Sequence, residues 1–248
     1  MSTGNDRPVR KVFSTKAGGV SLKPYASFNL ATHVGDDPEH VAANRQRLQR
    51  ILDLPKIQWM EQIHSNTVRV VEEYQPEPIE ACDAMVSTLK GVGLGVLVAD
   101  CVPVLLSDHE AGVIAAVHAG RLGARNGILP ATVRCMLELG ARAEHIHALL
   151  GPAASGSNYE VPEPMARDVE QHLPGSMVRT SAGTAGLDLR RGLVVQLYGL
   201  GVHNVYSDPR CTIEDESFFS YRREGTTGRQ AGVVWLPEHN GQKDSPKV

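Results

Sequence analysis

The sequence predicts a single α/β domain, built on a mixed sheet or on two packed sheets with helices outside. The chain has 248 residues, of which 42% are hydrophobic, and this is enough for one large core. Candidate strands that would pair with near neighbours are interspersed with candidate helices, and no Pro- or Ser-rich linker divides them. Regular strand–helix alternation and the glycine-rich nucleotide-binding motifs are absent, which argues against a Rossmann fold.

Four segments carry the spacing of apolar residues that is typical of an amphipathic helix. The first follows Asp37 and Pro38, which suit the N-cap and the first helical position. Its apolar face is expected to hold Val41, Leu48, Ile51 and Leu52. The other three helices are expected over residues 128–139, 162–173 and 189–200.

Strands are expected in the segments between these helices. Residues 92–120 are expected to form two apolar strands around the turn SDHEAG, and TVRVVEEY and VYSDPR are shorter candidates. Residues 217–236 are expected to form a hairpin around EGTTG. The ends of the chain, residues 1–8 and 237–248, are polar and are expected to be disordered.

Charge and hydropathy argue against nucleic-acid and membrane partners. The formal net charge is −3, and no run of Lys and Arg occurs. No apolar segment approaches the roughly 20 residues that span a bilayer, and the N-terminus lacks the apolar core of a signal peptide. We therefore expect a cytoplasmic protein whose four cysteines, none in a CxxC pair, are free thiols.

The apolar run VLVADCVPVLL contains Asp100, Cys101 and Pro103, which a buried strand rarely carries. Because Pro103 lacks an N–H, we expect strand pairing to be interrupted there and the Cys101 thiol to reach a cleft. Strand alternation would place Asp100 on the opposite face, as a structural hydrogen-bond acceptor. His118 ends the following apolar segment, and His64 precedes another candidate strand.

His64, Cys101 and His118 form a set of side chains that suits zinc. Three protein ligands leave a fourth coordination position for water, as in catalytic zinc sites. Their spacing in the sequence matches no compact metal-binding motif. The same residues would also allow Cys101 to act as a nucleophile with a histidine as its base, so both alternatives stay open.

A series of segments in fixed order extends from about Phe13 to Leu236. These segments are FSTKAGGVS, SFNLATHVGDDPEHVAANRQRL, EQIHSNTV, CDAMVST, ADCVPVLL, AAVHAG, LGPAASGSNYEV, DLR and FFSYRREGTTGRQAGVVWL. The series resembles the laccase-domain family, whose members carry the names polyphenol oxidase, purine nucleoside phosphorylase and peptidoglycan-editing factor. The resemblance implies one laccase-like domain over residues 1–248, a layered α/β/β/α sandwich with mixed sheets, and one zinc ion held by His64, Cys101 and His118.

The resemblance also implies an enzyme that acts on purine nucleosides. The implied reactions are phosphorolysis of adenosine, inosine and methylthioadenosine, and deamination of adenosine by a zinc-activated water. The three metal ligands would be the catalytic residues, and a nucleoside and phosphate would be the partners of a monomer or weak homo-oligomer.

Candidate substrate-binding residues lie in two other segments. Arg222 and Arg223, with Arg229 beside them, could hold phosphate, or could form a solvated hairpin edge. Asn29 could bind a ligand or satisfy a turn, and Lys16 is a weaker anion-binding candidate.

The sequence departs from the family pattern next to the second histidine. Members usually read HAGWRG, whereas this chain reads HAGRLG, so Arg121 and Leu122 replace the usual Trp and Arg. Either Arg121 or Arg125 could restore the positive charge. Ser65 also stands where Gly is usual, and Ser157 where members often carry Cys. These changes affect the expected substrate preference and leave the three metal ligands in place.

Three other functions stay open. A cysteine hydrolase or amidase acting on peptidoglycan precursors would need the Cys101 thiolate and no essential metal. A copper-dependent phenol oxidase would place copper at the same residues, but multicopper oxidation needs several histidine-rich centres, and the sequence supplies one set. A non-catalytic binding protein would show no turnover that depends on Cys101.

Overall fold

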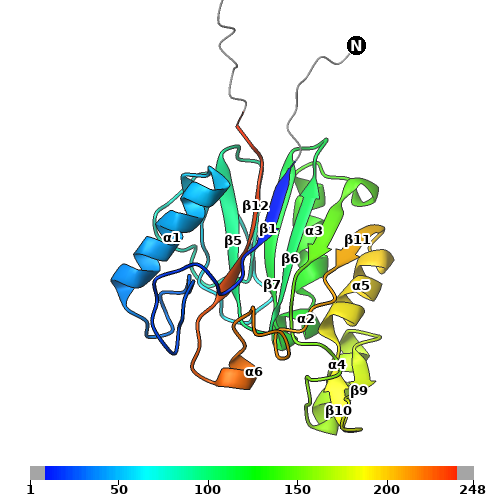
Figure 1. The fold of residues 1–248 in the computed structure, drawn as a ribbon. Coiled ribbons are helices and arrows are strands. Elements are labelled where there is room, and N and C mark those ends of the chain that lie inside the picture. The colour runs from blue at the N-terminus through cyan, green and yellow to red at the C-terminus, as the bar shows by residue number, and fades with distance from the viewer. Residues whose placement is uncertain (1–8, 239–248) are drawn as a thin grey trace, which may run out of the picture.

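Two sheets packed face to face form the centre of the computed structural model, which describes residues 9–238 (Figure 1). The strands are β1 (Arg10–Phe13), β2 (Lys56–Gln58), β3 (Val68–Val70), β4 (Ala84–Ser87), β5 (Val92–Val98), β6 (Val102–Asp108), β7 (Val113–Ala119), β8 (His147–Leu150), β9 (Met177–Arg179), β10 (Ala185–Leu187), β11 (Asn204–Ser207) and β12 (Gln230–Trp235). One sheet has the order β1-β12-β5-β2 and the other β11-β8-β6-β7-β4-β3, while β9 and β10 form a separate pair. Both large sheets are mixed, because β2–β5, β3–β4 and β8–β11 pair in parallel and the other pairs are antiparallel.

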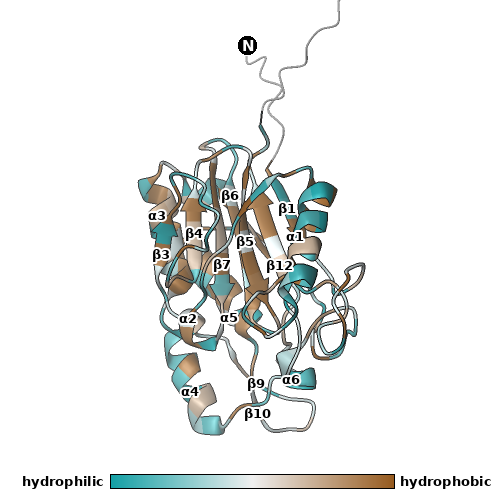
Figure 2. Ribbon diagram, turned by 90° about the vertical axis from the view of Figure 1, so that its left-hand side faces the viewer, coloured by the Kyte–Doolittle hydropathy of each residue, from teal (hydrophilic) through white to brown (hydrophobic). Residues whose placement is uncertain are grey.

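Helices cover the outer faces of the two sheets. The helices are α1 (Pro38–Leu52), α2 (Arg121–Arg125), α3 (Ile128–Glu138), the 3-10 helix η1 (Ala143–His145), α4 (Glu163–His172), α5 (Leu189–Gly199) and α6 (Tyr221–Glu224). The α1 helix lies against the four-stranded sheet, α3 and α5 lie against the six-stranded sheet, and α4 packs beside β9 and β10 (Figures 1 and 2). The layers are therefore α/β/β/α, as the resemblance implied.

Three apolar clusters fill the spaces between these four layers. In β5, Leu94 and Val96 face the six-stranded sheet, whereas Leu97 joins the cluster on the side of α1. Glycines on this second side make room for large neighbours. A Cβ at Gly95 would lie 2.6 Å from the ring of Trp59, so only glycine fits there. Apolar burial on both faces explains why the central strands read as continuous apolar runs.

The four predicted helices are confirmed, with one error on the face of the first. Asp37 caps α1 by accepting the N–H of Glu39 at 2.8 Å. However, Ile51 is 63% exposed. The chain turns back at Asp53, with φ of 50°, and Leu54 takes the contact with the sheet that was predicted for Ile51.

Residues 92–120 contain three strands, so the prediction of two is wrong. The chain leaves the four-stranded sheet after Val98 and enters the six-stranded sheet at Val102. Asp100 lies in this crossing with φ of 85°, a conformation that Asp tolerates better than most residues. Pro103 lies inside β6 opposite His118, so the interruption comes before the proline rather than at it.

The predicted C-terminal hairpin over residues 217–236 is also wrong. Its first half forms a loop and α6, whose first turn is capped by Ser220, since the Ser220 hydroxyl accepts the N–H of Arg223. Its second half is β12, and both edges of β12 are already paired, one with β1 and the other with β5. A hairpin partner would therefore have no free edge to pair with.

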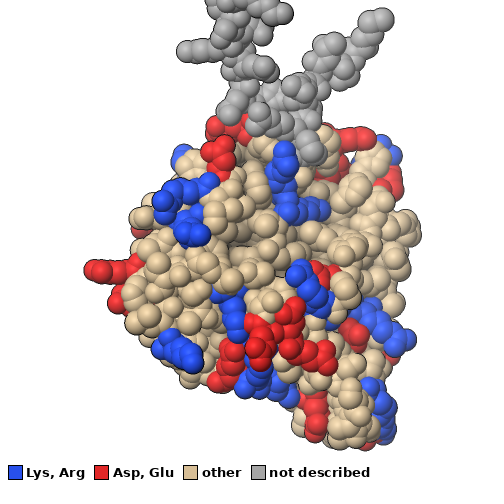
Figure 3. Space-filling view, in the orientation of Figure 1, with Lys and Arg blue, Asp and Glu red and all other residues tan. Residues whose placement is uncertain are grey.

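The remaining predictions about the chain concern its ends and its surface. Residues 1–8 and 239–248, for which disorder was expected, lie outside the described residues. Within residues 9–238, no helix is long and apolar enough to cross a membrane. On the face shown in Figure 3, Lys and Arg are interspersed with Asp and Glu and form no continuous basic surface.

Candidate metal centre

The structure brings His64, Cys101 and His118 together at one end of the space between the two sheets. Their ligand atoms all lie within 4.8 Å of one another, and the imidazole rings meet edge to face with centroids 4.7 Å apart. Cys101 is the last residue of the crossing from β5 to β6, His118 is the second-to-last residue of β7, and His64 lies in the loop before β3. Three segments that are distant in the sequence thus deliver two imidazoles and a thiol that one metal ion could share.

Asp83, directly before β4, orients two of these ligands. Its carboxylate pairs with Nδ1 of His118 at 2.8 Å, which leaves Nε2 as the metal-binding atom. The same carboxylate accepts the backbone N–H groups of His64 at 3.0 Å and Ser65 at 2.6 Å, and the Ser65 hydroxyl at 2.7 Å. These bonds hold the loop in which His64 has a φ of 60°. The fully buried Asp83 therefore supports both histidines from behind.

The electrostatics of the site follow from burial and from these contacts. Burial lowers the pKa of His64, and the neighbouring His118 lowers it further, so that the imidazole is neutral at pH 7 and able to bind metal. Burial also acts to lower the pKa of His118, but the Cys101 charge and the bonds from Asp83 outweigh it and raise that pKa to about 9. Burial acts to raise the pKa of Asp83, and hydrogen bonds from His118 and Ser65 reverse this, so Asp83 is a carboxylate. A cation that binds His118 would displace its proton.

The three ligands form part of the wall of a cavity of about 400 Å³, a size typical of small-molecule sites. Gly120 lies against the ligands. A Cβ at this position would come within 2.7 Å of Nδ1 of His64 and 3.2 Å of Sγ of Cys101. The glycine of the HAG segment is thus required by close approach to the centre.

Three arginines, Arg121, Arg222 and Arg229, also line this cavity. Within residues 9–238, none of the three lies within ion-pair distance of a carboxylate. Burial lowers the pKa of Arg229 from its usual value. Of the two positions that could restore the lost charge, Arg121 faces the cavity, whereas Arg125 is bound through two hydrogen bonds of 2.6 and 2.7 Å to Asp168.

Asp100 acts as a hydrogen-bond acceptor, as predicted. One carboxylate oxygen accepts the hydroxyl of Thr212 at 2.6 Å, and the other accepts the backbone N–H of Arg222 at 2.7 Å. Both bonds tie the C-terminal loop and α6 to the segment that carries Cys101. However, Asp100 lines the same cavity as Cys101, so the prediction that it lies on the opposite face is wrong, because both residues lie in the crossing between β5 and β6 and strand alternation does not apply there. Both oxygens of Asp100 are engaged in holding this wall of the cavity together.

Asn29 does not line the cavity. It is fully buried, its amide N–H₂ donates to Ala31 and Asp36, and its carbonyl oxygen accepts the backbone N–H of Arg229 at 2.9 Å. The second alternative from the sequence, that Asn29 satisfies a turn, matches these contacts. Asn29 is connected to the cavity wall only indirectly, through its hydrogen bond with the backbone of Arg229.

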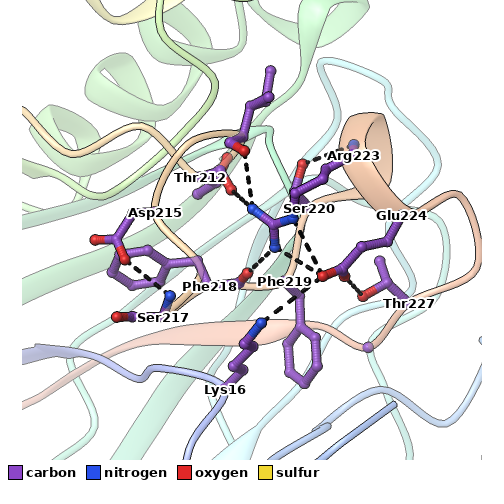
Figure 4. A network of polar contacts seen from close by, with 12 residues as sticks. Lys16, Thr212, Asp215, Ser217, Phe218, Phe219, Ser220, Arg223, Glu224 and Thr227 are labelled. Atoms are coloured by element: carbon purple, nitrogen blue, oxygen red, sulfur yellow. Dashed lines mark hydrogen bonds and ion pairs between the residues drawn. The ribbon is translucent and has the colours of Figure 1, made fainter. Parts of the chain in front are cut away.

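Arg223 also lies outside the cavity wall and forms the centre of a polar network (Figure 4). Its guanidinium group donates to the backbone carbonyls of Thr212, Ile213 and Phe218. It also binds Glu224 at 2.8 Å, and Lys16 approaches the same carboxylate at 3.8 Å. The structure thus places Arg223 and Lys16 in the support of α6, behind the arginines that face the cavity.

Among the described residues, the cysteines other than Cys101 are not part of the three-ligand group. Cys82, Cys135 and Cys211 are free thiols, like Cys101. Burial raises the pKa of Cys82 to about 12, so this thiol behaves as a small apolar side chain.

Three residues of the site were not recognised from the sequence. Asp83 gives a weak signal, because an acid directly before a buried strand in CDAMVST is unusual. Tyr159 and His33 line the cavity but come from loops with no chemical motif of their own. Loop residues of this kind are brought to a site by the fold and leave little trace in a single sequence.

Comparison with known proteins places the chain in a family. A family described as multi-copper polyphenol oxidoreductase laccase matches residues 10–237. The chain belongs to this family. It is 67% identical over 237 residues to a purine nucleoside phosphorylase of Corynebacterium glutamicum, covering 94% of this chain and 96% of the relative. It is 50% identical to a purine nucleoside phosphorylase of Mycobacterium bovis, covering 92% of each chain. The crystal structure of YlmD from Geobacillus stearothermophilus matches with a TM-score of 0.88 and 31% identity, covering 93% of each chain.

Within this laccase family, the chain carries one candidate metal centre. Across residues 9–238, His64, Cys101 and His118 form the one group of three metal-binding side chains that lie together. Multicopper oxidation depends on several copper ions with their own histidine ligands. The described part of the chain therefore resembles the family in fold and sequence without providing the several centres that the family description suggests.

Proposed function

We propose that the protein binds one zinc ion at His64, Cys101 and His118 and catalyses the phosphorolysis of purine nucleosides. The observation that carries this proposal is the convergence of three ligand atoms, within 4.8 Å, on a cavity that three arginines also line. The names of the two relatives point to the same reaction at the level of the family.

The donor atoms suit zinc. A thiolate and two imidazoles are ligands that Zn²⁺ prefers, and Asp83 fixes the tautomer of His118 as carboxylates do around zinc-bound histidines. When bound, zinc supplies Lewis-acid polarisation of an oxygen or nitrogen atom presented in the cavity.

Phosphorolysis needs a nucleoside and a phosphate held in contact. An oxygen of hydrogen phosphate bonds to C1′ of the ribose, the bond from C1′ to the purine nitrogen breaks, and the proton of the phosphate ends on the departing base. The products are a free purine and ribose 1-phosphate. The chain's contribution is to bind and orient both substrates, with guanidinium groups on the anion and the side chains of Tyr159 and Tyr221 at the wall for the base or sugar.

Deamination of adenosine in the same cavity is a second reaction to be tested. It replaces the amino group at C6 with oxygen from water and releases ammonia, and it needs a side chain that carries the proton between them. Asp100 was the candidate from the sequence, but both of its oxygens already accept hydrogen bonds from the protein. This observation ranks phosphorolysis above deamination.

The test combines metal analysis with product detection. Purified protein is assayed for bound metal and incubated with adenosine, inosine or methylthioadenosine, with and without phosphate. We expect about one zinc per chain. Free purine should form only when phosphate is present, together with ribose 1-phosphate from adenosine or inosine and with 5-methylthioribose 1-phosphate from methylthioadenosine. Inosine and ammonia formed from adenosine without phosphate would instead indicate deamination. Metal without any of these products would refute the proposed reaction.

Chelation separates the zinc enzyme from the cysteine hydrolase. We expect a chelator to abolish activity and added Zn²⁺, rather than Cu²⁺, to restore it. The variant Cys101→Ala should lose both metal and activity, and Cys135→Ala, on α3 away from the site, should keep both. Activity that survives chelation but is lost on alkylation would support a Cys101 nucleophile and contradict the zinc proposal.

A further inference from the structure

We infer that Arg121 is the specificity-determining residue of a subsite for a phosphate dianion, placed beside the metal centre and completed by Arg222 and Arg229. This inference rests on the proposed function and names the residues that take the anionic substrate.

The charges of the cavity are unbalanced toward the positive. Arg121, Arg222 and Arg229 line it, and among the described residues that line it Asp100 is the one acid. Its oxygens already accept hydrogen bonds from Thr212 and from the backbone of Arg222. Arg121 and Arg229 are half-buried and Arg222 is exposed, and no ion pair neutralises any of the three within residues 9–238, so an anion that enters the cavity meets three guanidinium groups with no competing carboxylate partner.

Two of the three arginines are fixed in place by the protein. One terminal nitrogen of Arg222 donates to the carbonyl of Glu160 at 2.9 Å, and the guanidinium group lies 5.0 Å above the ring of Tyr159. One terminal nitrogen of Arg229 donates to the carbonyls of Thr227 and Gly228, both at 2.9 Å. The remaining N–H groups of these guanidinium forks are available for an oxyanion at no further cost of ordering.

Arg121 differs from Arg222 and Arg229 in that its backbone lies directly beside the candidate metal centre. It directly follows Gly120, whose Cβ position would lie 2.7 Å from Nδ1 of His64, so the side chain starts at the metal centre. Arg121 lines the cavity together with Tyr159 and His64, and no carboxylate pairs with it within residues 9–238. Arg121 is therefore placed to hold an anion close to the ion, where the reaction is proposed to occur.

The subsite is tested by measuring, with calorimetry, the affinity of the metal-loaded protein for inorganic phosphate. We expect the dissociation constant for phosphate to rise about tenfold or more in Arg121→Met, with a smaller rise in Arg121→Lys, which keeps the charge but loses the planar fork. The matched control is Arg134→Met, which removes an exposed arginine from α3 and should leave phosphate binding unchanged. Circular dichroism and metal content establish that each variant is folded and loaded.

Steady-state kinetics give a second readout. In Arg121→Met we expect the KM for phosphate to rise while the KM for the nucleoside stays within about twofold, since uniform binding of one substrate is lost. Unchanged phosphate binding in Arg121→Met would overturn the inference, even if phosphorolysis is found. So would a wild-type protein that binds no phosphate, whether adenine is present or absent.

A third arm separates free phosphate from the phosphate of a nucleotide. If adenosine 5′-phosphate binds in an Arg121-dependent way and inorganic phosphate does not, the assignment to the co-substrate is overturned. Conversely, Arg121-dependent binding of inorganic phosphate supports the subsite even if no nucleoside is cleaved, so the two proposals can fail separately.

Discussion

At the scale of single residues, Asp83 joins two parts of the site, His118 and the loop around His64, through one carboxylate. It pairs with His118 at 2.8 Å and accepts the backbone N–H groups that shape the loop around His64. Asp83 itself does not line the cavity, so we expect it to act as a positioning residue for the two histidines of the candidate metal centre. A carboxylate that binds the far nitrogen of a metal-binding histidine affects metal affinity as well as ligand orientation.

We expect Asp83→Asn to lower zinc affinity by roughly 10- to 100-fold, because the amide keeps the shape but loses the charge and turns an N–H₂ group toward the N–H donors of Ser65. Competition with a chromophoric chelator measures the affinity. Asp108→Asn is the matched control, because Asp108 is also buried and accepts the backbone N–H groups of Ala111 and Arg142, at the far end of β6. Equal zinc affinity in wild type and Asp83→Asn would rule out this role.

At the scale of elements, α6 is too short to be stable by itself and is held by its surroundings. Arg223 binds three backbone carbonyls of the preceding loop, and Glu224 accepts the hydroxyl of Thr227 on the other side (Figure 4). This network fixes the short helix that presents Tyr221 and Arg222 to the cavity.

We expect Arg223→Met to lower the free energy of unfolding by roughly 1–3 kcal/mol, because it leaves partly buried carbonyls without their charged donor. Urea unfolding followed by circular dichroism measures the change. The control is Arg167→Met, which removes an exposed arginine paired with Glu163 along α4 and should change stability by less than about 0.5 kcal/mol. A loss in Arg223→Met no larger than that of the control would show that the network contributes nothing to stability.

The sequence predicts elements well where local pattern decides them and poorly where pairing over distance decides them. The caps and spacing of α1 are local, and its position was predicted correctly. The pairing of β12 with β1 and β5 joins distant segments, so the sequence near Glu224 led to the wrong prediction of a hairpin. The candidate metal-binding residues could be named because histidine and cysteine side chains at strand ends are rare, whereas Asp83 could not, because its role depends on where His64 and His118 meet.

At the scale of the whole molecule, the two sheets are joined by polar as well as apolar contacts. Lys11 of β1, in the four-stranded sheet, donates to the backbone carbonyl of His147 on β8, in the six-stranded sheet, at 2.6 Å. Burial lowers the pKa of this lysine from 10.5 to about 8. The charged form is therefore less favourable in the folded protein than in the unfolded chain, and this difference lowers the free energy of unfolding at neutral pH.

The lowered pKa of Lys11 sets the direction of a pH dependence. Between pH 8 and 10.5 the unfolded chain binds more protons at this site than the folded protein does, so the contribution of Lys11 to the free energy of unfolding rises with pH. The penalty is fully present below pH 8 and fades as the folded lysine loses its proton. Lys11→Met removes the titrating group. We therefore expect the free energy of unfolding of wild type, relative to that of this variant, to rise by roughly 1–2 kcal/mol between pH 7.5 and 10.

Urea unfolding of both proteins across this pH range measures the difference, which cancels the titration of other groups. Lys56→Met, which removes an exposed lysine of β2, is the control for a general effect of charge. If the difference between wild type and Lys11→Met stays constant with pH, or if Lys56→Met shows the same trend, the buried ammonium group does not burden the packing of the two sheets. If the stability difference rises with pH for Lys11→Met alone, the interface between the sheets holds a cation at a measurable cost in stability. The candidate metal centre lies at the other end of this interface.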